Sequence, residues 1–238
     1  MPARIPPPTV HTGTATITYR REGTGPTVVL LHALASSSAT WSTLTRDLVT
    51  SGREVIAPDL RGHGDSSWTS DYLLDSMEQD ITGALDTLGA KSFDLVGHSL
   101  GAHLAALLAG RHPARVRKLV LEDPPVPPRT APPRRPRRGV ALYLTAHGLV
   151  SRRFDRRLVA PVLTQLRAPD PAWWDAVSAI EAPTLVVGGG PRSSVPGERL
   201  TELAATIPNA DLVTIDAGHH VHGTRPEEFR DAVLRFLG

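Results

Sequence analysis

Hydrophobic residues along this chain fall into two patterns: short continuous runs, and longer segments in which apolar residues recur every three or four positions. A continuous run is typical of a strand buried on both faces, whereas the wider spacing is typical of an amphipathic helix. The runs predict strands over residues 27–31, 54–57, 93–96, 116–121, 184–187 and 212–215, and a weak alternation predicts an earlier strand over residues 14–22. The helical spacing predicts helices over residues 41–49, 74–88, 100–110, 171–180, 198–207 and 226–237, with a further one around 140–165.

Strands that alternate with helices predict an α/β fold, in which helices cover both faces of a mostly parallel central sheet. The long stretch 124–170 interrupts this alternation. We therefore predict a core formed by residues 1–123 and 171–238, into which residues 124–170 are inserted. Such an insertion would lie over the carboxyl ends of the strands, where sheets of this kind bind ligands.

Charge is distributed unevenly along the chain. The insertion holds ten arginines against two aspartates, a net charge of +8, whereas the whole chain carries only +2. Three interpretations stay open: a solvated lid, a surface that attracts acidic substrates, and a contact with nucleic acid or another anionic surface. Because no nucleic-acid-binding motif accompanies the charge, we expect no nucleic-acid partner.

The remaining composition excludes several classes of protein. The 238 residues include no cysteine, which rules out disulfides, thiolate catalysis and cysteine-based metal sites. The N-terminal segment lacks the apolar core of a secretory signal, and no apolar stretch approaches the ~18 residues that a membrane span needs. We therefore expect a cytoplasmic protein without a membrane span, whose partner is a small-molecule substrate.

The string Gly97-His98-Ser99-Leu100-Gly101 lies between a predicted strand and a predicted helix. Gly97 and Gly101 remove the side chains that a very tight turn cannot accommodate, so that Ser99 projects from the corner. The helix that follows points its N-terminal N–H groups and positive dipole end at this corner, where they would stabilise a developing anion. The pattern predicts that Ser99 is a nucleophile.

Four segments resemble the motifs of the α/β-hydrolase superfamily, in the order in which that family has them. They are residues 30–34, 59–66, 96–101 and 216–219, and the similarity extends from about residue 14 to the end of the chain. The resemblance implies the α/β-hydrolase fold, with the insertion in the position of the family's cap. It also implies a serine esterase-like hydrolase that uses a catalytic triad and needs no cofactor.

The resemblance assigns the nucleophile and the base of this triad. Ser99 matches the family's nucleophile. His219, which follows the last predicted strand, matches the base, and the nearby His220 and His222 are its alternatives.

The acid departs from the family's usual pattern, in which an aspartate follows the penultimate strand. At that position this sequence has Arg192, and no carboxylate appears before Glu198. Some branches of the superfamily take the acid from the end of the preceding strand, where Glu122 and Asp123 stand. Asp123 alternates out of the strand into the turn, so we assign it the role, with Glu122 as the substitute. Asp216 is interpreted as structural.

The resemblance also implies an oxyanion hole made of the backbone N–H groups of Leu34 and Leu100. Three further residues are candidates for the substrate pocket: His98, Trp41 and Trp173. No metal site is expected, because the histidines show neither H-E-x-x-H nor a supporting carboxylate spacing.

The predicted function is hydrolysis of an ester or related acyl bond in a small to moderate substrate, by Ser99, His219 and Asp123. The fold alone does not fix the chemistry, because the same triad serves C–C hydrolases, perhydrolases and lyases. A non-catalytic ligand-binding relative is the alternative from another class.

Overall fold

Eight strands form one central sheet in this computed structural model, which describes residues 7–130 and 153–238. The strands are β1 (Thr9–His11), β2 (Thr16–Glu22), β3 (Thr27–Leu31), β4 (Glu54–Pro58), β5 (Phe93–His98), β6 (Val116–Glu122), β7 (Thr184–Gly188) and β8 (Ala210–Thr214). Their order across the sheet is β1-β2-β4-β3-β5-β6-β7-β8. β1 and β2 pair antiparallel, and the strands from β3 to β8 pair in parallel. The predicted α/β fold class is confirmed.

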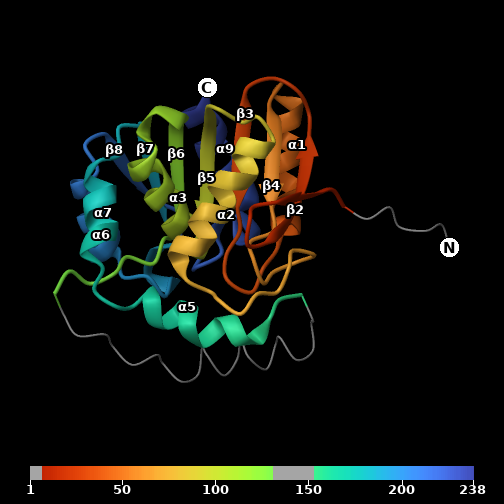
Figure 1. Cartoon of the computed structure of the whole chain (residues 1–238). Coiled ribbons are helices and arrows are strands. Elements are labelled where there is room, and N and C mark those ends of the chain that lie inside the picture. The colour runs from red at the N-terminus through yellow and green to blue at the C-terminus, as the bar shows by residue number, and fades with distance from the viewer. Residues whose placement is uncertain (1–6, 131–152) are drawn as a thin grey trace.

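Helices cover both faces of this sheet (Figure 1). They are α1 (Ser42–Thr50), α2 (Leu74–Thr87), α3 (Leu100–Arg111), α5 (Val159–Gln165), α6 (Pro171–Ser178), α7 (Gly197–Thr206), α8 (Val221–Thr224) and α9 (Pro226–Leu237). In β3, Val29 and Leu31 pack into the core under α2, α3 and α6, whereas Val28 and Leu30 pack into the core under α1 and α9. Because successive residues of a strand face opposite cores, the four positions from Val28 to Leu31 are all apolar.

The described part of the predicted insertion consists of residues 124–130 and 153–170. Within it, α5 lies beyond the carboxyl ends of the parallel strands (Figure 1), and Phe154 and Leu158 are buried in the core shared with α2 and α3. The predicted helix around 140–165 is described only as α5 and the short turn before it, because residues 131–152 lie outside the described residues. The division into a core and an inserted cap therefore stays a prediction.

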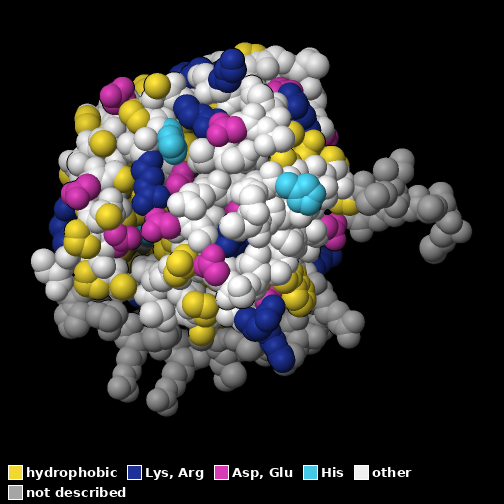
Figure 2. Space-filling model, viewed as in Figure 1, with side chains coloured by type: hydrophobic (Ala, Val, Ile, Leu, Met, Phe, Trp, Pro, Cys, Tyr) yellow, Lys and Arg dark blue, Asp and Glu magenta, His cyan; other side chains and the backbone are white. Residues whose placement is uncertain are grey.

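Acidic and basic side chains lie side by side on the face that Figure 2 shows. One ion pair joins Arg111 of α3 to Asp75 of α2 at 2.7 Å. In the inserted stretch, the Arg129 guanidinium lies 3.8 Å from the ring centre of Trp174. Five of the insertion's arginines fall outside the described residues, namely Arg134, Arg135, Arg137, Arg138 and Arg152. None of the described helices is both long and apolar enough to cross a membrane.

Candidate active site

The turn between β5 and α3 is strained at Ser99, whose backbone has φ 51° and ψ −115°. A side chain at Gly97 would run into the backbone of Gly101 and lie 2.6 Å from the Ala102 nitrogen, and one at Gly101 would run into the Leu31 carbonyl. The two glycines therefore permit the tight corner that the sequence predicts.

Three non-glycine residues of the described chain have positive φ: Ala35, Ser99 and Asp123. They follow β3, β5 and β6, which are neighbouring parallel strands, so the three strained residues lie at one edge of the sheet. Backbone conformations of this kind cost about 1–3 kcal/mol each and cluster at functional sites. This edge is the candidate active site.

A continuous hydrogen-bond chain joins the three residues assigned to the triad. The Nε2 atom of His219 lies 2.9 Å from the Ser99 Oγ, and its Nδ1 lies 2.6 Å from the Asp123 Oδ2. Because a carboxylate only accepts, Nδ1 carries the proton and Nε2 presents a lone pair to the Ser99 hydroxyl. Asp123 is fully buried, whereas the His219 side chain is 39% exposed and reachable by substrate.

The Asp123 carboxylate is fixed by groups at the end of β7. Its backbone N–H donates to the Val187 carbonyl (2.8 Å), and its Oδ1 accepts the Gly189 N–H (3.0 Å). Its Oδ2 accepts the Ser193 hydroxyl in addition to His219. The sequence pattern gives no sign of these roles of Gly189 and Ser193, because only the fold brings the loop after β7 against the end of β6.

Arg192, which stands where the family's usual acid would be, turns away from this carboxylate. Its guanidinium contacts Asp216, with Nε 3.1 Å from Oδ1 and a second nitrogen 2.6 Å from the backbone carbonyl. Both side chains are more than half exposed. The loop after β7 therefore supplies hydrogen-bond donors to the Asp123 carboxylate and contributes no carboxylate of its own next to His219.

Glu122, the substitute acid, binds a different histidine. Its carboxylate accepts two hydrogen bonds from His222, one from the backbone N–H at 2.9 Å and one from the ring Nδ1–H at 2.6 Å. Burial raises the pKa of Glu122, and the nearby histidines and the His222 N–H oppose that shift. Of the three histidines that the sequence left open, His219 is the one hydrogen-bonded to Ser99.

The two N–H groups assigned to the oxyanion hole belong to the turn after β3 and to the first residue of α3. Neither the Leu34 nor the Leu100 N–H has an acceptor among residues 7–130 and 153–238. The turn is held by His63, whose Nε2 accepts the Ala35 N–H at 3.1 Å. Burial lowers the pKa of His63 to about 3, so the ring is neutral and its lone pair can accept.

All three pocket candidates are buried inside the protein. Trp41 is fully buried, and its ring stacks on His222 with centroids 4.1 Å apart. Trp41 packs in the core against α9, and its role at a substrate pocket stays a prediction. His98 is also buried, and its Nε2–H donates to the His219 carbonyl at 2.7 Å. It therefore supports the loop that carries His219.

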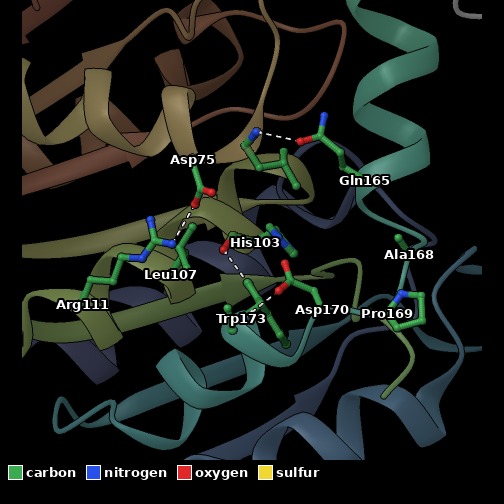
Figure 3. Close-up of a pocket in the computed structure, with 11 residues that line it drawn as sticks. Asp75, His103, Leu107, Arg111, Gln165, Ala168, Pro169, Asp170 and Trp173 are labelled. Carbon is green, nitrogen blue, oxygen red and sulfur yellow. Dashed lines mark hydrogen bonds and ion pairs between the residues drawn. The ribbon is translucent and has the colours of Figure 1, made fainter. Parts of the chain in front are cut away.

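The third candidate, Trp173, lines a cavity of about 190 Å³ between α2, α3, α5 and α6 (Figure 3). Its ring stacks on His103 with centroids 4.8 Å apart, and its indole N–H donates to the His103 carbonyl at 3.1 Å. The Asp75–Arg111 ion pair lies at the same cavity. His103 is one helical turn beyond Ser99, but the residues that line the cavity do not include Ser99, His219 or Asp123.

Comparison with known proteins gives one family and several relatives. Residues 26–178 match the sequence model of a family described as alpha/beta hydrolase fold. The sn-1-specific diacylglycerol lipase ABHD11 of Mus musculus is 31% identical over 252 residues, covering 91% of this chain and 82% of the relative. The 2-hydroxymuconate semialdehyde hydrolase of Pseudomonas sp. (strain CF600) is 30% identical over 262 residues, which cover 90% of this chain and 88% of the relative. Among solved structures, Est816, an N-acyl homoserine lactone degrading enzyme, superposes with a TM-score of 0.79 and is 28% identical. The match covers 96% of this chain and 100% of the Est816 chain.

Proposed function

Because this chain belongs to the α/β-hydrolase family, we propose that it is a serine hydrolase that cleaves an ester or related acyl bond. The observation that carries the proposal is the hydrogen-bond chain from Asp123 through His219 to Ser99 at a strained turn. A hydroxyl is a weak nucleophile near neutral pH, and a base oriented by an acid is what activates it.

In the proposed mechanism the Ser99 hydroxyl attacks the carbonyl carbon while its proton moves to His219 Nε2. The Asp123 carboxylate then stabilises the imidazolium, because it already accepts the Nδ1–H at 2.6 Å. The N–H groups of Leu34 and Leu100 would hold the oxyanion, each contributing about 3 kcal/mol in the transition state. The imidazolium returns its proton to the leaving group, and water activated by His219 releases the acyl group from Ser99.

The relatives support an acyl substrate. A diacylglycerol lipase and a lactone-degrading enzyme, as their names describe them, both act on compounds that contain ester bonds. A second candidate is favoured by the relative whose name gives a semialdehyde as its substrate. On the same triad, that reaction would be cofactor-independent cleavage next to a carbonyl group.

A fluorophosphonate probe and a series of 4-nitrophenyl esters of increasing chain length test the proposal, with Ser99→Ala as the matched control. We expect covalent labelling of Ser99 and turnover that the control lacks. Parallel incubation with 2-hydroxymuconate semialdehyde, followed by its absorbance, tests the second candidate. A wild-type protein that neither binds the probe nor exceeds Ser99→Ala on any ester would contradict the serine hydrolase.

A further inference from the structure

The cavity between α2, α3, α5 and α6 has no role in the proposed hydrolysis (Figure 3). Its volume of about 190 Å³ is enough for a small organic molecule. Because a cavity of about 150 Å³ holds one benzene molecule, this one admits a molecule of about six to eight non-hydrogen atoms. The chemistry of its lining decides which kind of molecule fits.

One ring at this cavity has a nitrogen without a partner. The His103 side chain is buried, and its Nδ1–H donates to the Pro125 carbonyl at 3.2 Å. Its Nε2 therefore carries a lone pair, and this atom has no hydrogen-bond partner among residues 7–130 and 153–238. Burial lowers the pKa of His103 to about 4, so the ring is neutral and the lone pair can accept. Since buried acceptors are normally paired, the cavity favours a ligand that donates a hydrogen bond.

A second free acceptor at the cavity belongs to Asp170. Its Oδ1 accepts the Trp173 N–H at 2.9 Å at the start of α6, whereas its Oδ2 has no hydrogen-bond partner in the described parts of the chain. The charge of Asp170 opposes the lowering of the His103 pKa, so the two groups lie close together. The Gln165 amide, by contrast, is already hydrogen-bonded at both its oxygen and its nitrogen.

Negative charge exceeds positive charge around this cavity. Arg111 is the one Lys or Arg among the described residues that line it, against the carboxylates of Asp75 and Asp170. The Arg111 guanidinium is also shared, since it lies 2.7 Å from Asp75 and 3.1 Å from Glu78. Asp170 forms no ion pair within the described chain. Coulomb attraction therefore favours a positively charged ligand over a neutral or an anionic one.

We propose that this cavity binds a small primary amine in its protonated form. An alkylammonium group carries three N–H donors and one positive charge, so it can donate to both the His103 Nε2 and the Asp170 Oδ2. The short alkyl chain would pack against the apolar part of the lining, which includes Leu107, Ala168 and Pro169. This site goes beyond the proposed hydrolysis and does not depend on it.

Isothermal titration of the purified full chain with n-pentylamine tests the site near neutral pH, where the amine is protonated. The comparison ligands are 1-pentanol and pentanoate, which have the same chain length but carry no charge and a negative charge, respectively. We expect one amine per chain and no binding of pentanoate. The alcohol should bind about tenfold more weakly or worse, because it forms no charge-assisted hydrogen bond.

Two variants show whether the amine occupies this cavity. Asp170→Asn keeps an oxygen that can cap α6 but removes the charge, so it should weaken amine binding by about tenfold or more. His103→Phe keeps a ring against Trp173 and removes the Nε2 acceptor, and it should weaken binding by a similar factor. The matched control is Asp175→Asn, which removes an exposed carboxylate from the same helix outside the cavity and should leave the affinity unchanged.

Absence of amine binding by the wild-type chain, or binding of 1-pentanol as tight as that of the amine, would overturn the site. An affinity that is the same in Asp170→Asn as in the wild type would also overturn it, and this variant covers the case in which His103→Phe does not fold. Amine binding by Ser99→Ala and ester turnover by Asp170→Asn should both match the wild type. Failure of the amine site and failure of the proposed hydrolase are therefore separate results.

Discussion

Replacing Asp123 by asparagine is the sharpest test of the proposed triad, because the structure dictates how the new amide must sit. The Gly189 N–H donates to the Asp123 Oδ1, and a backbone donor cannot become an acceptor. The amide oxygen must therefore occupy the Oδ1 position, and the NH₂ group must occupy the Oδ2 position. There it faces His219 Nδ1 and the Ser193 hydroxyl.

The hydroxyl of Ser193 can rotate and accept, but the ring of His219 has to change its tautomer. With an NH₂ group opposite, Nδ1 must present its lone pair, and the proton moves to Nε2. That nitrogen lies 2.9 Å from the Ser99 Oγ and can then no longer take the serine proton. In well-studied triads this exchange lowers kcat by up to ~10⁴-fold, which corresponds to about 5 kcal/mol in the transition state.

The assay is turnover of a 4-nitrophenyl ester, with circular dichroism to verify that each variant is folded. Asp123→Asn should lower kcat steeply and leave KM nearly unchanged. Glu122→Gln, one residue earlier, should keep most of the turnover, because Glu122 contacts His222 and not the base. The reverse outcome, with kcat retained in Asp123→Asn and lost in Glu122→Gln, would refute the assignment of the acid.

Three further predictions concern stability. Gly101→Ala should prevent the elbow from closing, since its methyl group would meet the carbonyl oxygens at the end of β3, and urea unfolding should show a large loss of stability or no folded protein. Trp173→Phe removes the indole N–H bond to a carbonyl on α3 and should lower the unfolding free energy by about 1–3 kcal/mol, with an unchanged urea midpoint as the contrary result. Burial lowers the pKa of His63, His98 and His222 from 6.5 to about 3, so between these pH values the unfolded chain binds protons that the folded chain does not. The unfolding free energy should therefore fall by about 1.4 kcal/mol per pH unit for each ring as the pH drops below 6.5, and a melting temperature that is flat from pH 7 to 5 would contradict this.

The hydrophobic pattern predicted the inner parallel strands well, because burial on both faces leaves a continuous apolar run. It also indicated β8, although most of the side chains of this strand are exposed. It missed β1, whose three residues include one buried side chain, Val10, and α8, whose four residues are too few for any periodicity. The pocket role of Trp41 stays a prediction, although its side chain is fully buried. Helical spacing marks a buried face but does not distinguish a core from a cleft, and Trp41 packs under α9.

The position of the acid illustrates what a sequence can and cannot determine. Glu122 and Asp123 are neighbours, so strand alternation alone requires that they point to opposite sides but does not say which side holds the base. The positive φ of 44° at Asp123 decides it, because the chain leaves the strand there and turns the carboxylate toward His219. That turn depends on the Val187 carbonyl and on Gly189, which belong to another strand and its loop.

The same contacts explain how the proposed acid can stand one strand away from its usual place. β6 and β7 are parallel neighbours in register, with Glu122 opposite Val187, so the end of β6 and the loop after β7 border the same space beside His219. A carboxylate from either strand can reach the ring. Once Asp123 fills that space, a second acid in the β7 loop would face it as a like charge, whereas a hydroxyl and a backbone N–H stabilise it. Ser193 and Gly189 supply these donors, and Arg192 is free to bind Asp216 at the surface.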